Sequence, residues 1–312
     1  MASAHVTAAR PSAAARITNK RMRWGEVLVK GLLALCALVS VATTLGIVVA
    51  LLVPAVEFFQ AVPIRYYLTG TEWAPLFEPA HFGVFPLVVG TLSVTLWACL
   101  VAMPFGLGAA IYLSEYARPR TRSVLKPALE VLAGIPTVVF GYFALTWVTP
   151  FLRDIGLDAE IFNALSAGLV IGVMLIPTVA SLSEDAMSAV PQALRDGAYG
   201  LGSNKLQVSL RVVVPAAVSG IIASFVLAIS RAVGETMIVL LAAGQQPVID
   251  WNPLHAVETM TAFIAATGQG DVPTGSIEYK TIFAVGLTLF VATFLMNIVS
   301  IRLVRRYREV YE

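Results

Sequence analysis

The sequence is short of charge, because only 13% of its 312 residues are Asp, Glu, Lys or Arg. Soluble domains carry about a quarter. Apolar residues make up 58% of the chain. A protein core of this length cannot bury so much apolar surface, so the composition excludes an ordinary soluble domain. Lipid is the environment that this composition predicts.

Cysteine and histidine are also scarce. The two cysteines, Cys36 and Cys99, lie in apolar runs far from any Cys-x-x-Cys spacing, and the three histidines form no His-Glu-x-x-His pattern. These absences argue against a disulfide framework and against a zinc site. We therefore expect the chain to bind no metal.

Nucleotide-binding and catalytic signatures are missing as well. The Gly-rich run 200–205 lacks the Gly-Lys-Ser/Thr ending of a phosphate-binding loop, and no such loop occurs elsewhere. The apolar segments hold no Ser/His/Asp set and no paired histidines, which disfavours an intramembrane enzyme. We expect this chain to be a non-enzymatic protein without an ATPase site of its own.

Long apolar runs fill most of the chain, and a membrane-spanning helix needs about 20 such residues. The first run is longer than the roughly 7–15 apolar residues of a signal peptide, so we expect it to be retained. Several runs contain Pro or Gly, which a packed bundle around a pathway tolerates. The sequence predicts an all-α integral membrane protein with six transmembrane helices, at about 31–53, 85–113, 127–151, 161–182, 213–243 and 281–304.

Basic residues are divided unequally between the two sides of these predicted spans. Of the 21 Lys and Arg residues, only Arg65, Arg153 and Lys280 fall in the loops of one side, and Arg231 falls within a span. All the others lie in the two tails and in the loops after the second and fourth spans. Both termini are therefore predicted to be cytoplasmic. Because these residues follow a membrane face, nucleic-acid binding is not needed to explain them.

The chain divides into a tail and one membrane domain. Residues 1–28 are rich in Ala, Ser and Arg and have no apolar period, which predicts a mobile basic cytoplasmic tail. Residues 29–312 form the predicted transmembrane domain, with long outer loops at about 54–84 and 244–280.

The predicted inner loop 184–214 is too long for a simple connection and too apolar for a disordered one. Its apolar residues at 194, 198 and 201 share one helical face. Gly202 suits the end of a helix, and Ser203 suits the start of the next. The loop is predicted to form two short surface helices joined by a sharp turn.

The spacing of residues in this loop is specific. Asp196-Gly197-Ala198 is followed after three residues by Gly202, and nine more residues lead to Val212, then Val214-Pro215. This pattern resembles the EAA coupling loop of binding-protein-dependent ABC importer permeases, with Asp for Glu and Gly for the first Ala. The resemblance implies that Asp196, Gly197, Ala198 and Gly202 dock in a groove on an ATPase subunit. Without it, an interfacial amphipathic helix that ends at Gly would explain the loop.

The predicted span 213–243 carries two charges, Arg231 and Glu235, which are four residues apart and would share one face of an unbroken helix. Charges at membrane depth line a pathway or pair with each other. In one interpretation Arg231 offers a planar cationic fork to a tetrahedral oxyanion, while Glu235 holds Arg231 or accepts a hydrogen bond from a protonated substrate oxygen. In the other, the two form a structural ion pair. Thr137 is a further candidate for the substrate path, although its hydroxyl could equally bond its own backbone.

The segments 230–237, 134–141 and 258–265 closely resemble the permeases of phosphate ABC importers and favour the PstC type over the PstA type. The resemblance covers about 82–308. It implies the type I ABC importer permease fold in the bacterial plasma (inner) membrane. The implied partners are a second permease subunit (PstA type), two ATPase subunits (PstB type) that use ATP and Mg, an extracytoplasmic phosphate-binding protein (PstS type), inorganic phosphate and membrane lipid. No cofactor is expected on this chain itself.

Two other functions stay open on the sequence. The chain could be a permease for another oxyanion, such as molybdate or sulfate. It could also be an ion-coupled secondary transporter with Glu235 as its proton site. The spacing of the coupling loop disfavours this second alternative, because a secondary transporter has no ATPase to dock.

Overall fold

The computed structural model describes the backbone of residues 24–307 and the side chains of residues 25–304. The chain divides into two compact units, residues 1–50 and residues 51–312. Helix α1 (Trp24–Ala61) begins inside the predicted tail 1–28, and residues 1–23 lie outside the described part. Nearly every described side chain of α1 in the first unit is exposed, although most are apolar. This suits a helix surrounded by lipid.

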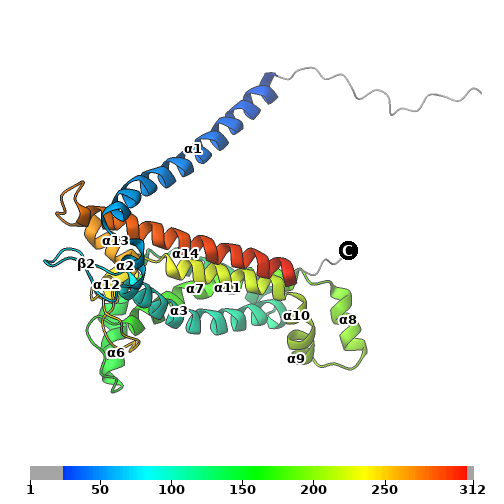
Figure 1. The fold of residues 1–312 in the computed structure, drawn as a ribbon. Coiled ribbons are helices and arrows are strands. Elements are labelled where there is room, and N and C mark those ends of the chain that lie inside the picture. The colour runs from blue at the N-terminus through cyan, green and yellow to red at the C-terminus, as the bar shows by residue number, and fades with distance from the viewer. Residues whose placement is uncertain (1–23, 308–312) are drawn as a thin grey trace, which may run out of the picture. The chain divides into compact units, whose positions relative to one another are not determined.

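The second unit is built mainly from helices (Figure 1). Strands β1 (Trp73–Ala74) and β2 (His81–Phe82) form a short antiparallel pair. The helices are α2 (Ile64–Thr69), α3 (Phe85–Ile111), α4 (Pro119–Ala133), α5 (Thr137–Phe143), α6 (Thr149–Asp154), α7 (Ala164–Ser188), α8 (Gln192–Gly200), α9 (Lys205–Val208), α10 (Val214–Ala216), α11 (Val218–Val233), α12 (Met237–Ala242), α13 (Met260–Gln269) and α14 (Ile277–Tyr307). Three π-helical turns, η2 (Tyr112–Tyr116), η3 (Ala144–Val148) and η4 (Ser209–Val213), continue or precede these helices.

The contact between α3 and α7 is the most extensive in the bundle. Gly168 and Gly172 lie one turn apart on the face of α7 that meets α3. A methyl group on Gly172 would lie 2.6 Å from Val101 Cβ and 2.9 Å from the carbonyl oxygen of Ala98. Small residues at this spacing let two helix backbones approach closely, which is how helices associate where lipid removes the hydrophobic drive. Residues of α5, α11 and α12 complete the same core.

Two of the predicted spans are broken. Within residues 24–307, four helices are long and apolar enough to cross a membrane, at 25–61, 85–116, 164–188 and 277–304. The other two candidates are bent pairs, 119–133 with 137–154 at 84° and 205–216 with 218–233 at 72°. Six spans result only if each pair counts as one. The predicted helices 127–151 and 213–243 are therefore not continuous. Pro136 cannot donate the backbone hydrogen bond that would extend a helix across it. The range 213–243 breaks at Ala217 and again between Val233 and Met237.

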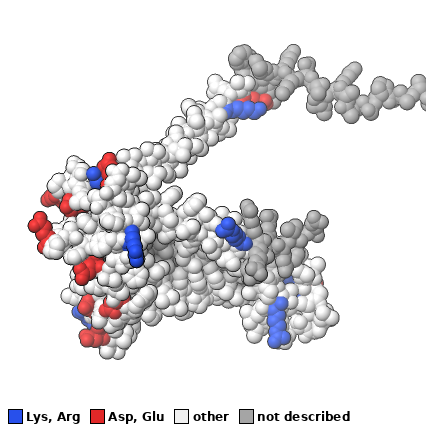
Figure 2. All heavy atoms as spheres, viewed as in Figure 1, with Lys and Arg blue, Asp and Glu red and all other residues white. Residues whose placement is uncertain are grey.

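The two ends of the second unit differ in charge (Figure 2). One end, here called the acidic end, carries β2, α6 and α13 (Figure 1). Most acidic residues of this unit lie in or beside these elements, among them Glu72, Glu78, Asp154, Asp158, Glu160, Asp250, Asp271 and Glu278. The opposite end, here called the basic end, carries α8, α9 and α10, together with the start of α4. Its basic residues are Arg118, Arg120, Arg122, Lys126, Arg195, Lys205 and Arg211.

The close contact of α3 and α7 predicts a size limit at Gly172. Gly172→Leu should lower the free energy of unfolding by about 1–3 kcal/mol or more, because the added side chain meets the α3 backbone. Gly108→Leu is the matched control, since a methyl group on Gly108 of α3 meets no atom within 4 Å. Thermal unfolding of the protein in detergent measures both. Equal unfolding temperatures for the two variants would contradict the packing argument.

Candidate functional site

The loop between α7 and α11 forms two short helices joined by a tight turn at the basic end. Gly202, just after α8, has a φ of +84°. Its amide donates to the carbonyl of Tyr199 at 2.9 Å, and the amide of Ser203 donates to the carbonyl of Ala198 at 3.1 Å. These two bonds make a Schellman motif, whose left-handed residue is usually Gly. The predicted helix–turn–helix structure and the helix end at Gly202 are confirmed.

Helix α9 begins one residue later than the sequence pattern predicts. Asn204, not Ser203, accepts the hydrogen bond from the amide of Gln207 at 2.9 Å. In return, the Gln207 side chain accepts from the amide of Asn204 at 2.9 Å. This reciprocal capping box satisfies two amides that the helix itself leaves free. The turn is thus fixed by hydrogen bonds on both sides.

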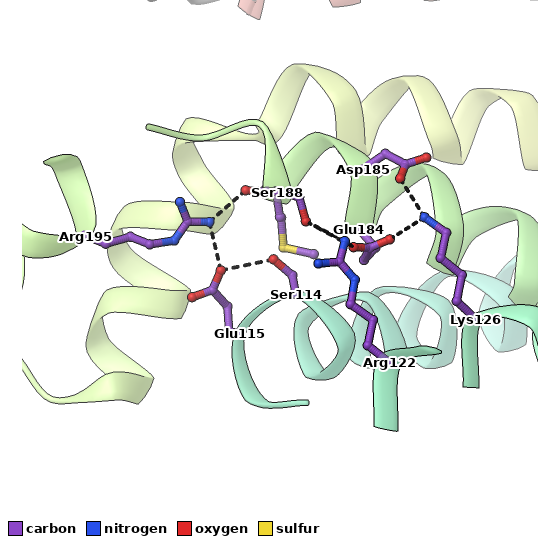
Figure 3. Close-up of polar contacts among 9 residues, drawn as sticks. Ser114, Glu115, Arg122, Lys126, Glu184, Asp185, Ser188 and Arg195 are labelled. Atoms are coloured by element: carbon purple, nitrogen blue, oxygen red, sulfur yellow. Dashed lines mark hydrogen bonds and ion pairs between the residues drawn. The ribbon is translucent and has the colours of Figure 1, made fainter. Parts of the chain in front are cut away.

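Arg195 fastens α8 to the rest of the bundle (Figure 3). Its side chain is only 10% exposed, and it donates to Glu115 Oε1 at 3.0 Å. The same guanidinium donates to the carbonyls of Met187, at 2.8 Å, and Val190. Glu115 lies in η2, at the end of α3, and Met187 lies at the end of α7. Arg195 therefore ties the loop to the ends of both central helices.

A second set of charges surrounds Glu184, which is fully buried at the end of α7 (Figure 3). Arg122 donates to Glu184 Oε1, and Lys126 donates to Glu184 Oε2 at 2.8 Å. Ser188 also donates to Oε1, at 3.0 Å, and Lys126 pairs with Asp185 at 2.8 Å. A buried carboxylate is tolerated when such donors satisfy its oxygens. The network binds α4, whose described side chains are never fully buried, to α7.

The four residues predicted for coupling lie together on or beside α8. Asp196 is exposed and accepts a hydrogen bond from Gln192 at 3.0 Å. Gly197 is exposed, with no atom within 4 Å of the methyl group that Ala would place there. Ala198 is half-buried against the cluster of Val208 and Val213, and Gly202 forms the turn. Apart from Ala198, these residues leave an open surface.

Arg231 lies in the last turn of α11 and is exposed. Its one hydrogen bond within the described chain is a long one, from Nη1 to Thr178 Oγ1 of α7 at 3.5 Å. Most of the five donors of the guanidinium are therefore open. A cation at the C-terminal end of a helix is also stabilised by the helix dipole. The guanidinium of Arg231 is therefore available to bind an anion.

The interpretation in which Arg231 and Glu235 form a structural ion pair does not hold among the described residues, and their predicted shared helix face is wrong. α11 ends at Val233 and α12 begins at Met237, so the two residues do not share the face of one helix. Glu235 Oε1 instead accepts from the amides of Met237 and Ile238, at 3.1 and 3.3 Å. These are free amides at the start of α12, where a negative charge is favourable. Glu235 is 9% exposed and caps a helix rather than neutralising Arg231.

Thr137 is the first residue of α5 and lies directly after the break at Pro136. Its hydroxyl has no hydrogen bond to any described residue, Arg231 included. A cavity of about 310 Å³ lies between α4, α7 and α11. It runs from Thr178, which meets Arg231, to Lys126 and Glu184 at the basic end. The structure thus connects Arg231 with the basic end and leaves Thr137 outside this arrangement.

Comparison with protein families identifies the chain. Residues 102–309 match the family described as binding-protein-dependent transport system inner membrane component. The chain belongs to this family of transporter permeases. It is therefore an ABC transporter permease subunit, and a multi-pass protein of the bacterial inner membrane.

Curated relatives and solved structures agree with this assignment. The permease is 34% identical over 287 residues to the probable ABC transporter permease protein YqgH of Bacillus subtilis, covering 91% of this chain and 92% of that protein. It is 33% identical over 279 residues to the phosphate transport system permease protein PstC 1 of Mycobacterium tuberculosis, covering 77% and 82%. A bacterial alginate ABC transporter shares its fold, with a TM-score of 0.63 at 15% identity over 91% of this chain and 97% of that one.

Several residues of the site do not follow from the sequence of the permease. Glu115 and Arg195 are 80 residues apart, and Arg122 and Glu184 are 62 apart. Their charges and their places at span ends are visible in the sequence, but nothing in it pairs them. Thr178 could have been noticed, because it follows Pro177 within an apolar run. Its meeting with Arg231 depends on how α7 and α11 pack.

The burial of Glu184 predicts that its charge contributes to the stability of the permease. Glu184→Gln should lower the free energy of unfolding of the permease by about 2–3 kcal/mol, because Arg122 and Lys126 lose their shared anion. Asp185→Asn is the matched control and should cost less than about 1 kcal/mol, since Asp185 is 59% exposed. Thermal unfolding in detergent compares them. A larger loss for Asp185→Asn would overturn the assignment of Glu184 as the centre of this network.

Proposed function

We propose that this permease is a transmembrane subunit of an ATP-driven importer of inorganic phosphate. The observation that carries the proposal is the open guanidinium of Arg231 beside the hydroxyl of Thr178 at a helix break. Planar guanidinium donors bind tetrahedral oxyanions with two parallel hydrogen bonds. The relatives named as phosphate transport permeases support phosphate as this anion.

Glu235 contributes to selectivity in this proposal. One of its carboxylate oxygens caps α12, and the other has no hydrogen bond within the described chain. A free carboxylate oxygen repels a fully ionised anion but accepts the hydrogen of a protonated one. Phosphate keeps such a hydrogen at neutral pH, whereas sulfate does not. One Arg in each permease chain also fits a site that a second permease subunit completes.

The charge of the two ends orients the permease. We place the basic end in the cytoplasm and the acidic end outside, because Lys and Arg favour the cytoplasmic side. Six spans, with each bent pair counted as one, then leave both termini in the cytoplasm. The coupling loop α8–α9 faces the cytoplasm in this orientation, as docking to an ATPase requires.

The surface of the coupling loop suits a partner. Its exposed apolar side chains are Leu194, Tyr199, Leu201 and Leu206, and Leu201 is 90% exposed. Such a cluster on a rigid helix–turn–helix fits a groove on a second protein. We propose that two ATPase subunits dock here and use ATP with Mg. A PstA-type permease subunit and an extracytoplasmic PstS-type phosphate-binding protein complete the proposed assembly.

Movement of the α8–α9 loop would be transmitted to the proposed substrate path through the ion pairs of Arg195 and Glu184. Arg195 ties α8 to the ends of α3 and α7, and Glu184 ties α7 to α4. Thr178 of α7 in turn touches Arg231. A push on α8 by a closing ATPase would therefore shift rigid helices rather than a loose loop. Such a shift alters the surroundings of Arg231.

The two alternative functions differ from a phosphate ABC importer in the anion transported or in the source of energy. A permease for sulfate or molybdate would use the same cationic fork but would not discriminate by protonation. An ion-coupled secondary transporter would need Glu235 to take up and release a proton. The capping role of Glu235 in α12 disfavours that use, because protonation would remove charge from the helix start.

Arg231 provides the test of the substrate site. In proteoliposomes containing the purified complex, Arg231→Ala should reduce uptake of radiolabelled phosphate at least 100-fold, because the fixed cation is lost. Arg231→Lys should retain part of the activity with weaker binding, since Lys has the charge without the planar fork. Competition with sulfate and molybdate identifies the preferred anion.

The Arg231 experiment needs a control at an exposed arginine outside the proposed substrate and coupling sites. Arg120, which is exposed at the start of α4 and has no ion pair to any described residue, supplies it as Arg120→Ala. That variant should transport at close to the normal rate. Normal phosphate uptake by Arg231→Ala would contradict the proposed site, and stronger inhibition by sulfate than by unlabelled phosphate would favour the other oxyanion.

Gly202 provides the test of coupling. Gly202→Val should break the turn, because a β-branched residue is strained at a φ of +84°. Gly202→Asn is the matched control, since Asn tolerates this conformation. Phosphate transported per ATP hydrolysed should fall several-fold in Gly202→Val and stay near normal in Gly202→Asn. An unchanged ratio in Gly202→Val, in an assembled complex, would count against docking at this turn.

A further inference from the structure

A cavity of about 480 Å³ opens at the acidic end, between the segment that begins at β1 and helix α13. Three aromatic side chains, Trp73, Phe77 and Phe263, contribute to its walls. Two carboxylates, Glu258 and Asp271, also line it. Asp271 is exposed, whereas Glu258 is only 7% exposed. The cavity therefore combines aromatic walls with one buried acid.

The backbone around Glu258 is fixed. The amide of Met260 donates to Thr91 Oγ1 of α3 at 3.0 Å, and the Thr259 side chain accepts from the amide of Ala262 at 3.1 Å. The Glu258 carboxyl has no hydrogen bond and no ion pair to any described residue. Burial raises the pKa of Glu258 to about 7. A buried acid without partners is costly, so its position in the cavity points to a partner that arrives from outside.

The aromatic residues fit the same partner. Trp73 is 3% exposed and meets Phe263 edge to face, with 4.9 Å between the ring centroids. Aromatic walls around a carboxylate stabilise a cation through the rings and through the charge. An apolar wall also suits the methylene stem of Lys or Arg.

Other sources of a cation fit the cavity less well. No group of three or more His, Cys, Asp or Glu side chains that could hold a metal ion occurs among the described residues. Two of the basic residues at the acidic end are already engaged. Lys280 pairs with Glu57 at 2.9 Å, and Arg153 donates to the carbonyl of Ala159 at 2.7 Å.

We propose that this cavity receives one Lys or Arg side chain of the extracytoplasmic binding protein, which pairs with Glu258 between the aromatic walls. The proposal rests on the proposed function, which supplies that protein and places the acidic end outside. Charge complementarity identifies the occupant as basic, because the surrounding surface is acidic (Figure 2). The site is therefore an anchoring point for docking, separate from the Arg231 site.

The position of Glu258 also connects docking with the substrate path. Three residues later in the chain, Thr261 Oγ1 donates to the backbone carbonyl of Glu235 at 2.6 Å. Glu235 lies in the break between α11 and α12, four residues after Arg231. A basic side chain that enters the cavity would contact the segment 258–261, which is hydrogen-bonded to the helix break at Glu235. Docking could therefore shift the backbone close to Arg231.

The test measures binding of the purified binding protein to the complete complex in nanodiscs. Glu258→Gln keeps the shape of the side chain and removes its charge, and it should weaken binding at least tenfold. Asp271→Asn is the matched control, because it removes an exposed charge from the same cavity, and it should change binding less than twofold. The unfolding temperature of the Glu258→Gln complex should not fall, since the variant removes an unpaired buried charge.

Proton competition gives a second readout. Glu258 and Asp271 are the titratable residues of the cavity lining. With the pKa of Glu258 at about 7, a bound cation must displace a proton at pH 6 but rarely at pH 8. Binding to the normal complex should therefore weaken up to about tenfold from pH 8 to pH 6. The Glu258→Gln complex should lack this part of the pH dependence, whereas Asp271→Asn should retain it.

Three results would overturn the inference. The first is normal binding by Glu258→Gln, and the second is an equal loss with Asp271→Asn. The third is release of the second permease subunit from the Glu258→Gln complex, which would make that subunit the occupant. Phosphate uptake by the normal complex is measured in parallel. Failure of that uptake would contradict the proposed function, whereas normal uptake with unaltered Glu258→Gln binding would contradict only this site.

Discussion

The close approach of α3 and α7 is the constraint on which the rest of the bundle depends. Gly168 and Gly172 bring the two backbones together, and the facing ends of these helices then carry the groups that hold other elements. Glu115 at the end of α3 receives Arg195 from the coupling loop, and Glu184 at the end of α7 receives two cations from α4. Thr178, in the same helix α7, meets Arg231. One rigid pair thus supports both the α8–α9 loop and the position of Arg231.

Breaks in the helices create the polar positions in this apolar bundle. Arg231 lies at the C-terminal end of α11 and Glu235 lies at the N-terminal end of α12, so each charge meets the helix dipole that favours it. Neither needs the other for neutralisation. This leaves the guanidinium open, which suits the proposed binding and release of an anion. The membrane permits such irregular backbone only inside a protein bundle or beside water.

Local features of this chain could be predicted from its sequence, whereas long-range ones could not. The two-helix loop and the end at Gly202 follow from residues that are neighbours in the chain. The prediction that Arg231 and Glu235 share a helix face is wrong because helical periodicity assumes an unbroken helix. Gly234, which lies between them, is a residue that disfavours a continuous helix. The pairs of Arg195 with Glu115 and of Arg122 with Glu184 join residues 80 and 62 positions apart, which only the packed structure brings together. The burial of Glu258 depends in the same way on α3 and α13.

The most direct test of the account is accumulation of phosphate inside proteoliposomes that contain the complete complex. ATP and Mg are enclosed in the vesicles and the binding protein is added outside, so only permeases inserted in one orientation can work. We expect accumulation only when ATP is on the side of the basic end and the binding protein is on the side of the acidic end. Accumulation driven by a proton gradient without ATP would contradict it.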